Sequence, residues 1–278
     1  MELKSIHKCH GGLLSYYSHA ANTTACDMGF TIFIPPQANE EKCPVVYYLA
    51  GLTCTEDNFT TKGNAYKLAA ELGLILVAPD TSPRGDDVPD EDGWDFAKGA
   101  GFYVDATEAP WDKNYNMYSY ITDELNTLIS DNFPVDKNRQ GIFGHSMGGH
   151  GALTIYLKNK DKYKSVSAFA PIVSPSNCPW GHKALGNYIG IDQRSWANYD
   201  ACLLMKAGEN AENEPEILID QGLADPFLES QLMPELFEKA CSEVGQKLNL
   251  RRHDDYDHGY FFISTFMEDH IRHHANIL

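Results

Sequence analysis

Short apolar runs and longer segments with helical spacing alternate along the 278-residue chain. Residues 44–49 are mostly apolar, which is typical of a strand covered on both faces. Residues 64–72 have helical spacing and stop at Gly73, which predicts a helix that ends in a glycine cap. Further strands are predicted at 13–19, 29–35, 74–78, 141–143, 165–170, 216–220 and 248–252, and further helices at 118–130, 152–157, 231–244 and 263–274.

Strands and helices that alternate in this way predict a mostly parallel sheet with helices on both faces. The first two predicted strands favour a hairpin at one edge of that sheet. No linker, repeat or low-complexity tract interrupts the pattern, so we expect a single domain over residues 1–278.

Three segments do not fit a strand or a long helix. Residues 50–59 are polar and predict a loop. Residues 80–112 are rich in glycine, proline and acidic side chains, and a loop of that length is usually functional. Residues 174–200 predict irregular or short-helical structure that forms a cap over a site.

A Gly-x-Ser-x-Gly sequence at Gly144, Ser146 and Gly148 joins a predicted strand to a predicted helix. This context is the one in which a serine occupies a sharp, strained turn and presents its hydroxyl above the sheet. The two glycines leave space for that turn, and the NH of Met147 points to where an oxyanion forms. The pattern therefore predicts a nucleophilic serine, and a glycine-rich turn with an incidental serine is the alternative.

The overall charge narrows the possible partners. The net charge of −17 argues against nucleic acid and anionic membranes as partners.

The seven cysteines lack Cys-x-x-Cys spacing, which disfavours a disulfide framework or a zinc ribbon. The first residues have no apolar core typical of a secretory signal, and no apolar run reaches the length of a membrane span, so we expect a cytoplasmic location.

A serine nucleophile needs a base and a carboxylate, which follow it in the order acid, then histidine, in this architecture. His258 lies in the polar turn after the last predicted strand, so we favour it as the base over a role as a surface histidine. On the terminal helix His270, His273 and His274 have the pattern of solvated side chains, and His145 is better placed to brace the turn.

Asp225 is the favoured acid because it lies a few residues beyond the predicted strand 216–220. Its carboxylate would fix the imidazole tautomer and stabilise the imidazolium. Asp220 is the rival, although its position suits the end of the strand. Asp257 adjoins His258, and neighbouring side chains in an extended turn diverge.

The second oxyanion donor is expected after the strand at 44–49. Gly51 allows a sharp turn there, so the NH of Leu52 faces the site. Cys54 follows closely and has no base left to make it a nucleophile. Either it is a thiol that blocks the pocket when modified or it is a small buried side chain.

Motifs along almost the whole chain resemble those of the S-formylglutathione hydrolases, also called the esterase D family. One of them is Gly-Leu-Thr-Cys-Thr at 51–55. The resemblance is carried by residues 51–59, 80–85, 94–96, 99–106, 143–153, 178–181 and 269–274. It implies a cytosolic α/β-hydrolase, usually a homodimer, that cleaves S-formylglutathione to glutathione and formate and completes formaldehyde detoxification. It also implies side activity on small esters, and neither a metal nor a cofactor is needed.

Residue by residue, the resemblance places the triad on Ser146, Asp225 and His258. It places the oxyanion NH groups on Leu52 and Met147, a pocket cysteine on Cys54 and a tryptophan near the acyl site on Trp180.

The sequence departs from the family pattern after the histidine. Family members read Ser-Tyr-Tyr there, whereas this chain has Gly259-Tyr260-Phe261, which removes two hydroxyls. The negative charge of glutathione calls for a local cation, for which Lys62, Arg84 and Lys183 are candidates. The acidic residues between 86 and 92 lack the spacing of a calcium loop and are expected to be solvated.

Other functions fit parts of this pattern. An acyltransferase or a generalist short-chain carboxylesterase would use the same triad. A catalytically dead hydrolase fold used for binding is a third possibility, against which the full set of triad candidates argues.

Overall fold

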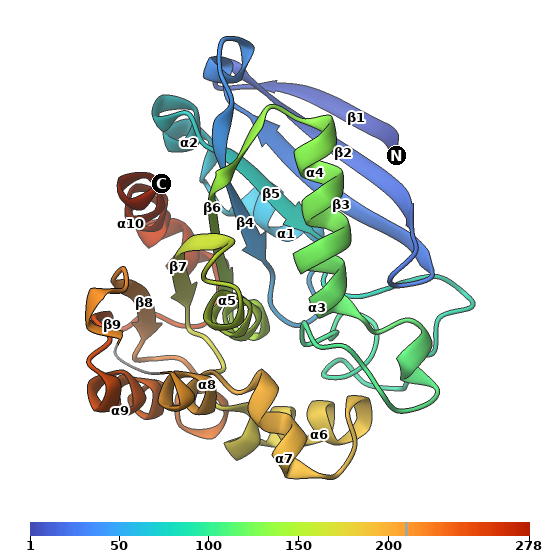
Figure 1. The fold of residues 1–278 in the computed structure, drawn as a ribbon, viewed down its shortest axis with the longest axis vertical. Helices are drawn as coiled ribbons and strands as arrows, with labels where there is room; N and C mark the ends of the chain where they lie inside the picture. The colour runs from blue at the N-terminus through green and yellow to red at the C-terminus, as the bar shows by residue number, and fades with distance from the viewer. Residues whose placement is uncertain (209–210) are drawn as a thin grey trace.

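The computed structural model describes residues 1–208 and 211–278. A nine-stranded sheet runs through the molecule in the order β1-β2-β3-β5-β4-β6-β7-β8-β9 (Figure 1). The strands are β1 (Glu2–Cys9), β2 (Gly12–Ala21), β3 (Cys26–Ile34), β4 (Cys43–Leu49), β5 (Ile75–Pro79), β6 (Val135–His145), β7 (Tyr163–Phe169), β8 (Ile217–Gly222) and β9 (Leu248–His253).

Strands β5, β4, β6, β7, β8 and β9 pair in parallel, and β1, β2 and β3 extend the sheet in antiparallel fashion beside β5. The mostly parallel sheet is therefore as predicted, and the predicted hairpin is present as β2 and β3, although β1 lies outside it and forms the edge. The sequence pattern did not predict β1, whose side chains are largely exposed, and it predicted only the buried end of β6.

The main helices follow the strands in the expected alternation. They are α1 (Glu56–Lys62), α2 (Tyr66–Leu72), α3 (Met117–Ser119), α4 (Asn126–Asn132), α5 (Met147–Lys158), α6 (Pro179–Tyr188), α7 (Gln193–Trp196), α8 (Ala201–Ala207), α9 (Pro234–Val244) and α10 (Tyr260–Ile277). A π-helical turn, Tyr120–Leu125, joins α3 to α4. Helix α2 ends at Gly73 with φ 71°, as the predicted glycine cap requires.

The prediction of a loop over residues 50–59 was wrong in its second half, where α1 begins. Thr55 caps this helix, since its side chain accepts from the backbone of the first turn while Asn58 bonds back to the Thr55 NH. This reciprocal capping box satisfies NH groups that a polar loop would leave to water. Helix α1 thus starts directly after the turn that contains Gly51 and Leu52.

Strand β7 shows that helices cover both faces of the sheet. Ser167 and Phe169 point toward α10, where His270 stacks on the Phe169 ring at 3.7 Å between centres. Ala168 points the other way, against α5 at Gly149. Because side chains alternate along a strand, these contacts place α10 and α5 on opposite faces.

The prediction that His270 and His274 are solvated was wrong, because both side chains are fully buried. His274 bonds to Ser165 and Ser167, with nitrogen–oxygen distances of 2.6 and 3.0 Å. His270 joins Ser167 to Asp220. These histidines lie between α10 and the sheet, and side chains of strands distant in the sequence satisfy their hydrogen-bonding groups.

The long segment after β5 is largely irregular, as predicted, yet it is not a surface loop. Phe96, Phe102 and Tyr103 within it are fully buried. The segment packs beside the carboxyl ends of the parallel strands and supports the turn that follows β4 there. In the part of the chain that the structure describes, no helix combines the length and the apolar character needed to cross a membrane.

Candidate active site

Ser146 lies between β6 and α5 in a strained conformation, with φ 58° and ψ −118°. Three backbone hydrogen bonds hold it there. Its NH donates to the Phe169 carbonyl at 2.9 Å, and its carbonyl accepts from the NH groups of His150 and Ile172 at 3.0 and 3.2 Å. Such strain persists only where the surroundings fix it, and it clusters at functional sites.

Gly144 and Gly148, the glycines on either side of Ser146, allow main chains to touch directly. A Cβ on Gly148 would lie 1.9 Å from the Leu49 carbonyl oxygen, and one on Gly144 would lie 2.3 Å from the Gly148 oxygen. Gly51 also lies close to the serine, since a Cβ on it would sit 3.2 Å from that of Ser146. The end of β4 and the serine turn therefore form one close backbone contact.

This contact brings the two predicted oxyanion donors to the same place. Leu52 follows Gly51, and among the residues described its NH makes no hydrogen bond to another backbone group. Met147 is the first residue of α5, and the first NH groups of a helix have no partner within it. Both NH groups thus lie on segments that adjoin Ser146.

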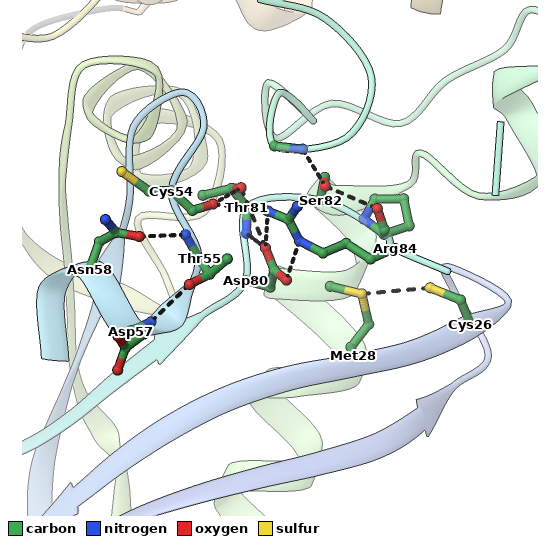
Figure 2. Close-up of polar contacts among 12 residues, drawn as sticks. Cys26, Met28, Cys54, Thr55, Asp57, Asn58, Asp80, Thr81, Ser82 and Arg84 are labelled. Atoms are coloured by element: carbon green, nitrogen blue, oxygen red, sulfur yellow. Dashed lines mark hydrogen bonds and ion pairs between the residues drawn. The ribbon is translucent and has the colours of Figure 1, made fainter. Parts of the chain in front are cut away.

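Figure 2 shows how the turn after Leu52 is held by side chains from the end of β5. The Cys54 carbonyl accepts from Thr81 Oγ1 at 2.6 Å and from the Arg84 guanidinium at 3.1 Å. Asp80 in turn binds Arg84 Nε at 2.7 Å. We call Asp80, Thr81 and Arg84 the carbonyl clamp.

Two more bonds anchor the same turn to the irregular segment. The Tyr103 hydroxyl donates to the Ala50 carbonyl, and the Thr53 NH donates to the Gly99 carbonyl, both at 2.9 Å. Sequence reasoning missed this support, although the opposite charges of Asp80 and Arg84, four residues apart, were a visible signal. The segment thus helps to fix the turn that carries Leu52.

The structure joins Asp225 to His258. Asp225 follows β8, and its Oδ2 lies 2.5 Å from His258 Nδ1. The other carboxylate oxygen accepts from the Phe227 NH at 2.8 Å, and Gln221 Nε2 lies 3.3 Å from Oδ2. With its oxygens engaged, the buried carboxylate has one orientation and holds the imidazole by Nδ1. Gln221 and Phe227 were not predicted from the sequence.

The rival carboxylates have other partners. Asp220 lies within β8 and binds Arg251, His253 and His270. Asp257 accepts from the NH of Gly259 and so shapes the turn before α10.

His145, the last residue of β6, lies next to the His258 imidazole. It immediately precedes Ser146, is buried, and its ring centre lies 4.4 Å from that of His258. Burial lowers the pKa of His145 well below its usual value, and the nearby His258 lowers it further, so this ring is neutral. Among the described residues, no hydrogen bond joins Ser146 Oγ to His258 Nε2; such contacts often tighten only when substrate binds.

Aromatic side chains form one wall beside the imidazole. The Phe227 ring lies 5.1 Å from that of His258 and 4.8 Å from that of Trp180. Trp180, near the start of α6, is 7% exposed and also contacts Trp94. Part of the segment 174–200 therefore flanks the site, as the predicted cap would. Cys54 is partly buried, and burial raises the pKa of its thiol while Lys62 opposes that rise.

The three candidate cations differ in their surroundings. Arg84 is engaged by Asp80 and the Cys54 carbonyl. Lys183 pairs with Glu91 and Asp95 at 2.5 and 2.7 Å. Lys62 is exposed, and no carboxylate within 1–208 or 211–278 pairs with it. Of the acidic residues between 86 and 92, Asp90 pairs with Lys98, and Asp86, Asp87 and Asp92 are exposed.

Comparison with known proteins places the chain among esterases. The family model described as "Putative esterase" matches residues 21–273. An S-formylglutathione hydrolase of Rattus norvegicus is 54% identical over all of this chain and 99% of its own, and that of Mus musculus is 53% identical over the same shares. A solved S-formylglutathione hydrolase from Agrobacterium tumefaciens superposes with a TM-score of 0.97 at 54% identity, and each chain is fully covered.

The sheet, its helices and these neighbours define an enzyme of the α/β-hydrolase fold, an esterase-type hydrolase. Within that class the chain belongs to the S-formylglutathione hydrolase family, which confirms the resemblance found in its motifs.

Proposed function

We propose that the protein hydrolyses the thioester S-formylglutathione to glutathione and formate through a serine acyl-enzyme. The hydrogen bond between Asp225 and His258, beside the strained Ser146, is the observation that carries this proposal. The names of its relatives support the substrate.

Ser146 is the nucleophile in this proposal, His258 the base and Asp225 the residue that orients the base. His258 Nε2 takes the hydroxyl proton as Ser146 Oγ bonds to the formyl carbon. The oxyanion accepts hydrogen bonds from the NH groups of Leu52 and Met147. Loss of one such donor costs about 3 kcal/mol of transition-state stabilisation.

The C–S bond then breaks, and the glutathione sulfur leaves with the proton that His258 held. A water molecule next gives its proton to His258 and attacks the formyl-serine. Formate leaves, and the proton returns to Ser146 Oγ. Asp225 stabilises the imidazolium in both halves of the cycle.

Trp180 and Cys54 belong to the substrate pocket in this proposal. The wall formed by Trp180 and Phe227 next to the imidazole supports a small acyl site. We therefore expect activity on short-chain esters that declines as the acyl chain lengthens.

In the cell, this activity would complete formaldehyde detoxification in the cytoplasm. We also propose that residues 1–278 act as one domain, since all nine strands form a single sheet. A homodimer is the proposed assembly, and the exposed apolar side chains of Leu3, Ile6 and Leu13 at the β1 edge support a covered face there.

The test compares kcat/KM for S-formylglutathione with the values for acetyl and butyryl esters. We expect the formyl thioester to exceed both by at least about tenfold, since each added methylene in a fitted pocket is worth about 1–3 kcal/mol. Ser146→Ala should abolish the burst of nitrophenol from a short-chain ester. Equal activity of this variant would refute the serine mechanism.

A generalist short-chain carboxylesterase is the second candidate, because Trp94, which contacts Trp180 of the aromatic wall, is 53% exposed and adds an apolar surface for longer acyl groups. Similar kcat/KM values for the formyl, acetyl and butyryl substrates would favour it. Ester products formed with a competing alcohol would instead indicate an acyltransferase.

A further inference from the structure

A cavity of about 510 Å³ opens beside the candidate active site and is lined by Lys62, Tyr260, Phe261 and Ser264. We call it the Lys62 cavity. Lys62 is the last residue of α1, and the other three residues come from the first turns of α10. These helices begin directly after the turn that contains Leu52 and after the loop that contains His258, respectively.

A short series of rings connects this cavity to the reacting groups. The Tyr260 ring lies 6.3 Å from that of His145, which in turn lies 4.4 Å from that of His258. The Tyr260 hydroxyl is held 3.4 Å from that of Tyr48 in the core. The sulfur of glutathione is on its middle residue, and about nine bonds separate it from the carboxylate of the γ-glutamyl arm. This arm spans about 10 Å when extended, which is comparable to the two ring-to-ring steps from His258 to Tyr260.

The charge of Lys62 distinguishes it from the other cations near the site. Arg84 and Lys183 are neutralised by carboxylates, whereas Lys62 has no such partner within the described ranges. Its Nζ lies 5.9 Å from the centre of the Tyr260 ring. In a chain with a net charge of −17, an unpaired ammonium group at the rim of a cavity creates a local site for an anion.

The rest of the lining suits a peptide rather than a bare anion. Phe261 is 89% exposed, an unusual position for a large apolar side chain. Its ring and that of Tyr260 offer flat surfaces to a peptide backbone, and the Ser264 hydroxyl adds a polar group.

We propose that the Lys62 cavity binds the peptide part of the thiol leaving group, with the Lys62 ammonium paired to one of the two carboxylates of glutathione. This inference rests on the proposed function and adds the residue that selects the leaving group. Lys62 acts on binding and not on the chemical step, so KM changes more than kcat.

The experiment measures inhibition of nitrophenyl acetate hydrolysis by S-methylglutathione, which has no acyl group to lose. We compare the wild type with Lys62→Met, Lys62→Glu and the control Lys67→Met, which removes an equal charge from the exposed face of α2. The inhibition constant should rise about three- to tenfold for Lys62→Met and further for Lys62→Glu, while the control stays within about twofold.

Two analogues of S-methylglutathione, one with its glycine carboxylate amidated and one without its γ-glutamyl carboxylate, identify the paired group. One of them should bind the wild type as weakly as the parent binds Lys62→Met, and should lose no further affinity in that variant. If neither carboxylate is coupled to Lys62, the inference is wrong.

Turnover of S-formylglutathione by the wild type distinguishes failure of the proposed substrate from failure of the cavity assignment. Efficient turnover together with unchanged Lys62 variants overturns only the cavity assignment. Poor turnover together with inhibition that depends on Lys62 overturns the proposed substrate and supports the cavity. Absence of inhibition of the wild type by S-methylglutathione also overturns the cavity assignment.

Discussion

Asp225 Oδ2 lies 2.5 Å from His258 Nδ1, and the loops that carry the two residues are packed together by their main chains. A Cβ on Gly222, at the end of β8, would lie 2.3 Å from the Tyr256 carbonyl oxygen. The NH of Ala224 donates to that same carbonyl at 2.9 Å. The carboxylate is therefore placed by the backbone rather than by a flexible side chain.

This geometry predicts that Asp225→Asn lowers kcat by about 10³–10⁴-fold with little change in fold. An amide presents an NH₂ group to Nδ1 and favours the wrong imidazole tautomer. Steady-state kinetics, with a thermal melt of the same sample, provide the check. A fall of less than tenfold in a folded variant would mean that Asp225 does not orient the base.

Arg84→Lys should lower kcat by about three- to thirtyfold and leave KM nearly unchanged. Lysine keeps the charge but cannot bind Asp80 and the Cys54 carbonyl together in the fork geometry of arginine. The turn with Leu52 then loses part of the carbonyl clamp. Arg139→Lys is the matched control, since Arg139 also binds an aspartate and a backbone carbonyl, but at the start of β6. Equal effects of the two changes would contradict a positioning role for the clamp.

Gly148→Ala should abolish activity and lower the melting temperature sharply, because the added methyl group would lie 1.9 Å from the Leu49 carbonyl oxygen. Gly186→Ala in α6 provides the contrast. Its Cβ would meet nothing closer than 3.8 Å, and alanine favours a helix over glycine by up to about 1 kcal/mol. Melting temperatures should therefore move in opposite directions for the two variants.

Asp220→Asn should destabilise the fold by about 3–5 kcal/mol, the cost of breaking a buried ion pair. Asp220 is fully buried and lies between Arg251 and two histidines. Although burial raises its pKa, hydrogen bonds from His270 and Arg251 hold the pKa well below the ordinary value.

The control for this change is Asp269→Asn. Asp269 pairs with the same Arg251, but its side chain is 51% exposed, so its loss should cost at most about 1 kcal/mol. Urea titrations of both variants measure the difference, and similar costs would show that the buried pair adds nothing.

His150 predicts a loss of stability as the solution becomes acidic. Burial lowers its pKa to about 4, while its hydrogen bond to the Phe102 carbonyl partly opposes that shift. The folded state thus binds fewer protons than the unfolded state between pH 4 and the ordinary histidine value near 6.5. Stability is full above that window and falls as pH drops through it, by about 3 kcal/mol for this group.

His150→Gln keeps a donor for the Phe102 carbonyl and removes the titrating group. Its unfolding free energy should depend less steeply on pH between 4.5 and 6.5 than that of the wild type. Parallel curves for the two proteins would mean that His150 does not carry this dependence.

The parallel strands could be predicted because β4, β5 and β8 are buried on both faces, so β4 and β5 are largely apolar and β8 begins with an apolar run. Strand β1 could not, because it lies at an edge, where most of its side chains are in water. Helix α1 was missed although its capping box, Thr55 with Asn58, is visible in the sequence. The apolar spacing of such a short helix gives little signal, so the cap was the better indicator.

The site residues proposed from the sequence are those whose type is fixed by chemistry and whose order follows from the α/β-hydrolase fold, namely a serine between glycines, an acid and a later histidine. Their supports depend on the folded chain. Nothing in the sequence places Thr81 at the Cys54 carbonyl, or Phe227 beside both Asp225 and Trp180. The burial of His270 and His274 likewise depends on serines about a hundred residues earlier.

The direct meeting of the Leu49 and Gly148 main chains has a practical meaning for redesign. This backbone contact sets the spacing between the end of β4 and the turn at Ser146, and it leaves no room for a side chain at Gly148. Under the proposed mechanism, exchanging Trp180 and Phe227 in the aromatic wall should admit new acyl groups and leave this backbone contact unchanged. Libraries for altered selectivity belong at the wall, and the contact between the two backbones is best left untouched.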